Sequence, residues 1–212
     1  MKALIIGATG ATGKDLVNVL LNDTAYTEVV IFVRRGTGIV HPKLAEVLTD
    51  FDRLEKVAGS INGDVLFSLL GTTLKDAGSK EKQWHIDYEI PFKFAEMAKK
   101  NGVAKIVLLS AYGASPTSRI FYSRIKGKLE EAITGLAFGQ FFIFRPGLLL
   151  RKNTDRAGER LSAGILKLLN SVGLIRKFKP MPTAILAEKL AKAPTMLTRG
   201  QHIIELNKIF GF

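Results

Sequence analysis

A glycine-rich turn joins the first apolar segment of the chain to a helix-like segment. Residues 2–6 read Lys-Ala-Leu-Ile-Ile, which is typical of a short buried strand. Gly7, Gly10 and Gly13 follow at a spacing of three residues, and a helical pattern begins at once. This spacing lets the chain turn tightly, lets backbone approach a pyrophosphate, and lets the helix pack against the strand. The motif predicts a dinucleotide site formed by Gly7, Thr9, Gly10, Ala11, Thr12 and Gly13.

Strand-like and helix-like patterns alternate along the chain, which predicts βαβ units and a parallel sheet. Strands are predicted at residues 2–6, 28–33, 45–49, 64–70, 104–110, 140–145 and 202–206. Helices are predicted at residues 12–22, 52–59, 88–100, 121–134, 157–170 and 182–193. The expected fold class is α/β, a doubly wound Rossmann fold with a mainly parallel seven-stranded sheet in the order 3-2-1-4-5-6-7. We expect a single NAD(P)-binding domain over residues 1–212, with a substrate-facing segment at about 150–180.

The composition excludes several kinds of site. Because the chain has no cysteine, it forms neither disulfides nor thiolate metal sites. His41, His85 and His202 lack the spacing of metal ligands, so no metal is expected. The apolar start is too short for a signal peptide, and no run reaches the roughly 18 apolar residues of a membrane span. We therefore expect a cytoplasmic protein without a transmembrane segment.

The positive charge is concentrated in the last third of the chain. Residues 151–212 contain 12 basic and 4 acidic residues, and so carry +8 of the net charge of +12. A basic surface can bind nucleic acid. Here the charges alternate with apolar residues and few aromatics, so nucleic acid is the least favoured partner. We expect a small-molecule substrate, for which an anion is one option, with a protein partner as a further option and a monomer or homodimer as the assembly.

The residues after the second predicted strand indicate which cofactor binds. An NAD site has an acid there, about 20 residues past the glycines, for the ribose 2′-hydroxyl. This chain has Arg34 and Arg35, beginning 21 residues after Gly13. Guanidinium groups suit a 2′-phosphate, so NADPH/NADP is the expected cofactor. Asp50 and Phe51, after the third strand, are expected to contact the adenine. The alternative is that Asp50 or Asp52 is a helix N-cap, and one residue could have both roles.

A tyrosine and a lysine four residues apart follow the fifth predicted strand. Tyr122 and Lys126 share one face of the predicted helix. A neighbouring ammonium is expected to lower the phenol pKa from its usual value of about 10. Tyr122 could then protonate a carbonyl oxygen or deprotonate an alcohol. Ser110 is the third candidate catalytic residue, and the end of the fourth strand is expected to line the cofactor site with Leu70, Gly71 and Thr72.

Four segments carry a resemblance to a known family. They are Leu70-Gly71-Thr72-Thr73, Leu108-Leu109-Ser110, Tyr122-x-x-x-Lys126 and Phe144-Arg145-Pro146-Gly147-Leu148-Leu149. On these residues the chain resembles the atypical short-chain dehydrogenases/reductases of the NmrA-like branch, and among them the oxidoreductases related to the Tat-interacting protein. Flavin reductases of the biliverdin reductase B type share the first motif but lack the Tyr-Lys pair. The resemblance implies that Tyr122 is the acid/base residue, that Lys126 also binds the nicotinamide ribose, and that the cofactor site includes Pro146, Gly147 and Leu148.

One position departs from the pattern of that family. Many members have two serines after the fifth strand, of which the second polarises the substrate carbonyl, whereas this chain has Ala111 there. The expected function is NADPH-dependent reduction of a carbonyl or enone of an unidentified small molecule. Tyr122 would give the proton, with Lys126 and Ser110 as the other catalytic residues. Because of Ala111, the alternative is a non-catalytic regulatory protein that senses NADPH/NADP.

Overall fold

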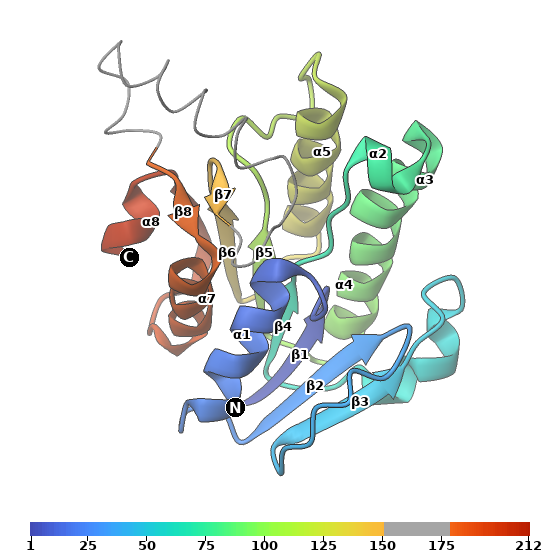
Figure 1. The fold of residues 1–212 in the computed structure, drawn as a ribbon, viewed down its shortest axis with the longest axis vertical. Coiled ribbons are helices and arrows are strands. Elements are labelled where there is room, and N and C mark those ends of the chain that lie inside the picture. Colours follow the sequence, from blue (N-terminus) through green and yellow to red (C-terminus); the bar gives the residue numbers. More distant parts are fainter. Residues whose placement is uncertain (151–178) are drawn as a thin grey trace.

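The computed structural model describes residues 1–150 and 179–212. The strands of its main sheet are β1 (Lys2–Ile6), β2 (Glu28–Val33), β3 (Leu44–Leu48), β4 (Val65–Ser68), β5 (Lys105–Leu109), β6 (Gln140–Arg145) and β9 (Gly200–Glu205). Their order is β3-β2-β1-β4-β5-β6-β9, and each neighbouring pair is parallel. This is the predicted order, so the predicted fold class is confirmed (Figure 1). A separate two-stranded sheet pairs β7 (Leu149–Leu150) with β8 (Met181–Pro182).

The helices between these strands largely match the predicted ones. They are α1 (Ala11–Asn22), α2 (Leu74–Ala77), α3 (Lys80–Trp84), α4 (Ile90–Lys100), α5 (Phe121–Gly135), α7 (Thr183–Lys192) and α8 (Lys208–Gly211). The helix predicted at 52–59 is a 3-10 helix, η1 (Leu54–Ser60), and a second short one is η4 (Ala193–Thr195). A π-helix, η2 (His85–Glu89), leads directly into α4. The helix predicted at 157–170 lies outside the described residues, as does nearly all of the expected substrate-facing segment.

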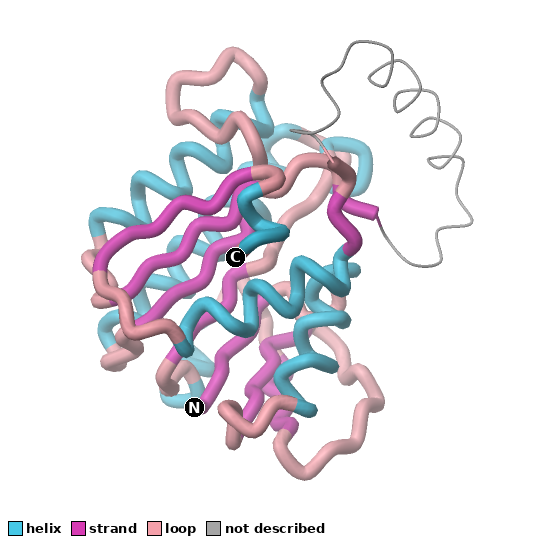
Figure 2. The backbone as a smooth tube through the Cα atoms, turned by 90° about the vertical axis from the view of Figure 1, so that its left-hand side faces the viewer, coloured by secondary structure: helices cyan, strands magenta, loops and turns pink. Residues whose placement is uncertain are grey.

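Helices cover the seven-stranded sheet on both faces (Figures 1 and 2). On one face α1 and α7 lie side by side over a core that includes Ile5, Ile31 and Phe67. On the other face α4 and α5 cover the alternate side chains, for example Leu4 and Leu66. Because both sides of each central strand are buried, the strands need continuous apolar sequences. This explains why they were recognisable as unbroken apolar runs.

The turn from β1 to α1 is packed too tightly for side chains at two of its glycines. Gly7 has a φ of +86°, and a Cβ there would lie 2.6 Å from the carbonyl carbon of Leu69. A Cβ on Gly13 would lie 2.1 Å from the carbonyl oxygen of Gly7, so α1 approaches the end of β1 only because that atom is missing. Gly10 is the N-cap of α1. Within the part of the chain that the structure describes, no side chain forms a capping hydrogen bond at this helix start. The N–H groups and positive dipole end of α1 are therefore available to an anion.

This geometry separates the roles of two glycines. Gly13→Ala should lower the free energy of unfolding by about 2 kcal/mol or more, because the new methyl group overlaps a backbone oxygen. Gly10→Ala should cost less, roughly 1 kcal/mol or below, since its Cβ meets its nearest neighbour at an ordinary 3.4 Å and the loss is confined to the poorer N-cap preference of alanine. Urea unfolding of both variants measures the difference. Equal loss of stability in the two would contradict the packing argument.

Candidate functional site

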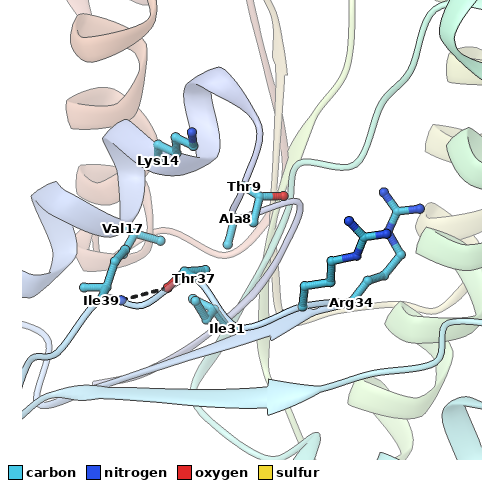
Figure 3. A pocket seen from close by; sticks show the side chains of 10 residues that line it. Ala8, Thr9, Lys14, Val17, Ile31, Arg34, Thr37 and Ile39 are labelled. Atoms are coloured by element: carbon cyan, nitrogen blue, oxygen red, sulfur yellow. Dashed lines mark hydrogen bonds between the residues drawn. The ribbon is translucent and has the colours of Figure 1, made fainter.

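Two cavities flank the glycine-rich turn. The α1–β2 cavity, of about 780 Å³, lies between α1 and the end of β2 (Figure 3). The α5 cavity, of about 710 Å³, extends from the start of α1 to the start of α5. Of the predicted site residues, the first cavity is lined by Thr9, Arg34 and Arg35. The second brings together Gly10, Ala11, Thr12, Gly13, Leu70, Gly71, Thr72, Ser110, Tyr122 and Lys126.

Six predicted site residues line neither cavity: Gly7, Asp50, Phe51, Pro146, Gly147 and Leu148. Gly7 forms the turn behind the cavities and accepts a hydrogen bond from Gly10 N at 3.1 Å. Asp50 Oδ1 accepts from Asp52 N at 3.1 Å, which is a turn-forming role close to the alternative foreseen for it. A contact between these residues and a cofactor remains a prediction.

The α1–β2 cavity combines an apolar floor with a basic rim. Val17 and Ile31 are buried, whereas Lys14, Arg34 and Arg35 are exposed along the cavity. In Figure 3, Lys14 projects from α1, and Arg34 extends from the end of β2. None of these three cations forms an ion pair with another described residue. Lys14 is missing from the sequence prediction, although its position directly after Gly13 was an available signal.

An acid from β3 holds the loop that follows these arginines. Thr37 N donates to Glu46 Oε2 at 3.0 Å, and the Thr37 hydroxyl donates to the same carboxylate. Ile39 N in turn donates to Thr37 Oγ1 at 3.2 Å (Figure 3). Glu46 is thus engaged with the loop, and the cavity keeps its positive character.

In the α5 cavity, the predicted tyrosine and lysine occupy the first two turns of α5. Tyr122 is partly exposed, whereas Lys126 is only 2% exposed. Lys126 Nζ lies 5.9 Å from the centre of the Tyr122 ring and donates to Leu70 O at 3.0 Å. The lysine therefore joins α5 to the loop after β4, directly below the tyrosine on the helix face.

A buried aspartate that the sequence prediction missed lies beside this pair. Asp87 is fully buried, and its Oδ1 accepts from Thr72 N at 2.7 Å. Its Oδ2 is buried without a hydrogen-bond partner among the described residues. Asp87 belongs to the π-helix η2, a kind of distortion that is frequent at functional sites. The only sequence signal was its position one residue before the predicted helix at 88–100.

The electrostatic surroundings reverse one expectation. Burial, together with the negative charge of Asp87, raises the pKa of Tyr122 to about 12. Burial lowers the pKa of Lys126, although Asp87 and Glu130 oppose that shift. The expected lowering of the tyrosine pKa by Lys126 is therefore wrong, because burial of the phenol and the negative charge of Asp87 both raise that pKa. Near neutral pH, Tyr122 is a protonated phenol suited to give a proton.

Ser110 directly follows β5, and its hydroxyl is hydrogen-bonded to a neighbouring acid. Its Oγ donates to Oε1 of Glu130, one turn beyond Lys126 on α5. Arg145 Nε donates to the same oxygen at 3.0 Å, and its Nη2 donates to the other carboxylate oxygen. Arg145 Nη1 also reaches Glu205 at 2.7 Å. Ser110 lines the cavity, but its proton is engaged with a buried acid.

A histidine bridges two segments at the outer edge of the site. His85 Nδ1 lies 2.8 Å from Glu89, and its Nε2 lies 2.7 Å from Asp52, in the loop after β3. The hydrogen bond to Glu89, with that to Asp52, raises the pKa of His85. The imidazole of His85 thus connects the π-helix to the loop after β3.

The described residues contain no cluster of three or more histidine or acidic side chains placed to bind a metal ion. Within the same residues, no helix combines the length and apolar character that crossing a membrane requires.

Comparison with known proteins finds relatives of this chain. A family model described as NAD(P)H-binding matches residues 7–159. The "Protein FMP52-1, mitochondrial" of Scheffersomyces stipitis is 35% identical over 181 residues, covering 82% of this chain and 79% of that protein. Protein HTATIP2 of Rattus norvegicus is 34% identical over 163 residues, covering 74% of this chain and 67% of that protein.

Solved structures of similar fold include MoeE5 in complex with UDP-glucuronic acid and NAD. It superposes with a TM-score of 0.74 and 16% identity, covering 97% of this chain and 76% of its own. The enzyme WbmH of Bordetella bronchiseptica, in complex with NAD+, superposes with a TM-score of 0.71 and 18% identity. The match covers 95% of this chain and 74% of WbmH. At these identities the likeness concerns the fold.

The names of the yeast relatives correct one expectation. FMP52 proteins of Scheffersomyces stipitis, Saccharomyces cerevisiae and Candida albicans are all named mitochondrial. The cytoplasmic location expected from the sequence is contradicted by these names. It rested on the lack of a recognisable leader, which is weak ground for locating a protein.

The histidine bridge makes stability depend on pH. Because the pKa of His85 is raised in the folded protein, its contribution is complete below about pH 6.5, the unfolded value. The contribution is lost as the pH rises through the raised value. Urea unfolding between about pH 5.5 and 8.5 should therefore show a steeper fall for the wild type than for His85→Asn. A His202→Asn control should retain the wild-type slope, and parallel curves for wild type and His85→Asn would contradict the bridge.

Proposed function

Because the chain belongs to the NAD(P)H-binding family of atypical short-chain dehydrogenases/reductases, we propose that it is an NADP-dependent oxidoreductase. Its reaction would be the reduction of a carbonyl or enone of a small molecule. The observation that carries this proposal is the α5 cavity, in which a glycine-rich helix start and a Tyr-Lys pair line one space. The solved neighbour MoeE5, bound to a UDP-sugar acid and NAD, is consistent with a small-molecule substrate.

The residues of the α5 cavity fit a nicotinamide dinucleotide. Gly10 leaves room above the start of α1, where free N–H groups would bind the pyrophosphate. Leu70, Gly71 and Thr72 would line the middle of the cofactor, and Lys126 would hold the nicotinamide ribose. When bound, the reduced nicotinamide supplies a hydride, which adds to the carbonyl carbon and leaves NADP+.

Tyr122 would complete the reduction by giving its phenolic proton to the substrate oxygen. With its pKa raised to about 12, Tyr122 carries that proton at neutral pH and is present as the acid. The raised pKa also makes the phenol a weaker acid, so the transfer relies on the alkoxide that forms on hydride addition, which is far more basic than the carbonyl. Asp87 and Lys126 would fix the charge balance around it, since both lie buried behind the tyrosine. General acid catalysis of this kind contributes roughly 10²- to 10⁴-fold in rate.

The basic rim of the α1–β2 cavity supports NADP in preference to NAD. Arg34 and Arg35 stand where an acid would bind the 2′-hydroxyl, and Lys14 adds a third cation. Glu46, the acid on the neighbouring strand, is engaged with Thr37 and so is unsuited to that hydroxyl. A 2′-phosphate would satisfy all three cations.

One observation favours a second candidate function, an NADPH/NADP sensor without catalysis. Ala111 offers no hydroxyl, and the proton of Ser110 is directed to Glu130. A substrate carbonyl would then rely on Tyr122 alone for a hydrogen bond. Removing one such donor commonly costs 10²- to 10³-fold in rate.

The cofactor preference can be measured by titrating protein fluorescence with NADPH and NADH. Replacing Arg34 and Arg35 by alanine should weaken NADPH binding on the order of tenfold or more and leave NADH binding nearly unchanged. The wild-type preference should also shrink as salt is raised. Lys189→Ala with Arg199→Ala, two cations outside both cavities, is the charge-matched control. Equal wild-type affinities for the two cofactors would refute the preference.

A single hydroxyl distinguishes the enzyme from the sensor. Tyr122→Phe should reduce turnover by about 10²-fold or more while NADPH affinity stays near that of the wild type. Lys126→Ala should lower both the turnover rate and the affinity for NADPH. Tyr88→Phe, on a ring stacked against Phe92 outside the cavity, is the matched control. If the wild type binds NADPH but reduces no compound of a broad carbonyl panel, the sensor is the correct function.

A further inference from the structure

The direction of one hydrogen bond restricts what the α5 cavity can bind. Ser110 Oγ bonds to Glu130 Oε1, and both residues are 5% exposed. Arg145 binds both oxygens of the same carboxylate, forming a two-point ion pair. An ionised carboxylate has no proton to give and can only accept hydrogen bonds. The hydroxyl of Ser110 is therefore the donor in its bond with Glu130.

A serine hydroxyl has one proton and two lone pairs. With its proton directed to Glu130, Ser110 can offer a ligand in the cavity only its lone pairs. Its neighbour Ala111 supplies no hydroxyl, and Lys126, whose Nζ donates to Leu70 O, is assigned to the nicotinamide ribose in the proposed function. Of the three proposed catalytic residues, Tyr122 is then the one whose hydroxyl can donate to the ligand, and Ser110 is an acceptor.

We propose that Ser110 is a hydrogen-bond acceptor for the ligand, and that the cavity selects hydroxyl compounds over the corresponding carbonyl compounds. An alcohol can donate to Ser110 Oγ and accept from Tyr122, so both partners are satisfied. A ketone can accept a hydrogen bond from Tyr122, but it has no proton to donate to Ser110. The lone pairs of the ketone oxygen would then face a lone pair of Ser110 Oγ. The inference rests on the proposed function for the identity of the site, and it adds the substrate class, an alcohol/carbonyl pair in which the alcohol binds more tightly.

The test compares two probes that cannot react. Cyclohexanone has no hydride donor in protein saturated with NADP+, and 1-methylcyclohexanol has no hydrogen on its hydroxyl-bearing carbon to lose. Chemical-shift titrations of the protein measure the affinity of each. The tertiary alcohol should bind about fivefold more tightly, the equivalent of one ordinary hydrogen bond. Equal affinities, a preference for the ketone, or no measurable binding of the alcohol would overturn the inference.

Variants at the two bonded residues separate the acceptor role from simple packing. Ser110→Ala should remove the alcohol preference by weakening alcohol binding without weakening ketone binding, while the control Ser60→Ala, outside the cavity, should retain the preference. Glu130→Leu releases the Ser110 proton, so ketone affinity should rise toward that of the alcohol, with a melting curve to confirm folding. If Ser110→Ala leaves the alcohol preference intact, the inference fails whatever the result at Glu130.

These measurements do not depend on turnover. Absence of reductase activity, or failure to bind NADP+, would contradict the proposed function and leave the probe preference measurable in the unloaded cavity. A ketone preference in a protein that binds NADP+ and reduces carbonyls would contradict the inference about Ser110 alone.

Discussion

The close approach of α1 to the end of β1 is the constraint on which the rest of the site depends. That approach needs a missing Cβ at Gly13, which lies against the carbonyl of Gly7. It aims the uncapped start of α1 along the carboxyl edge of the sheet, where ligands bind in such folds. The two cavities follow from it, because one opens on each side of the turn. The basic rim and the Tyr-Lys pair would otherwise be unrelated surfaces of the molecule.

Around Lys126, the protein gathers buried charges that are costly to desolvate. Asp87, Lys126 and Glu130 are each at most 5% exposed, and Arg145 forms an ion pair with Glu130. Such groups persist when they are paired or hydrogen-bonded, and removing one partner leaves an uncompensated buried charge. Their hydrogen bonds fix the positions of α5, the loop after β4 and the ends of β5 and β6 relative to one another. Such a cluster is weak evidence for stability, since well-packed apolar residues of similar volume are often at least as stabilising.

The sequence was sufficient for the topology, because each strand reads as an apolar run and the helices separate those runs. It also placed Tyr122 and Lys126 together, since residues four apart share a helix face. What it could not supply were contacts between distant segments. The tyrosine pKa depends on Asp87, 35 positions away, and the lysine is engaged by the backbone of Leu70. Likewise the proton of Ser110 goes to an acid on another element, and no local pattern records that bond.

The π-helix of residues His85–Glu89 is the feature with the widest consequence for how this chain can vary. A π turn contains about one residue more than an α turn, so it acts as an insertion absorbed inside a helix. Deleting one residue from it would restore a regular helix and would rotate all residues before it by about 100° relative to α4. If the deleted residue follows Asp87, Asp87 would turn away from Thr72, and the loop after β4 would lose one of the hydrogen bonds that hold it. Length changes here are therefore coupled to the site itself, whereas surface loops elsewhere can absorb them.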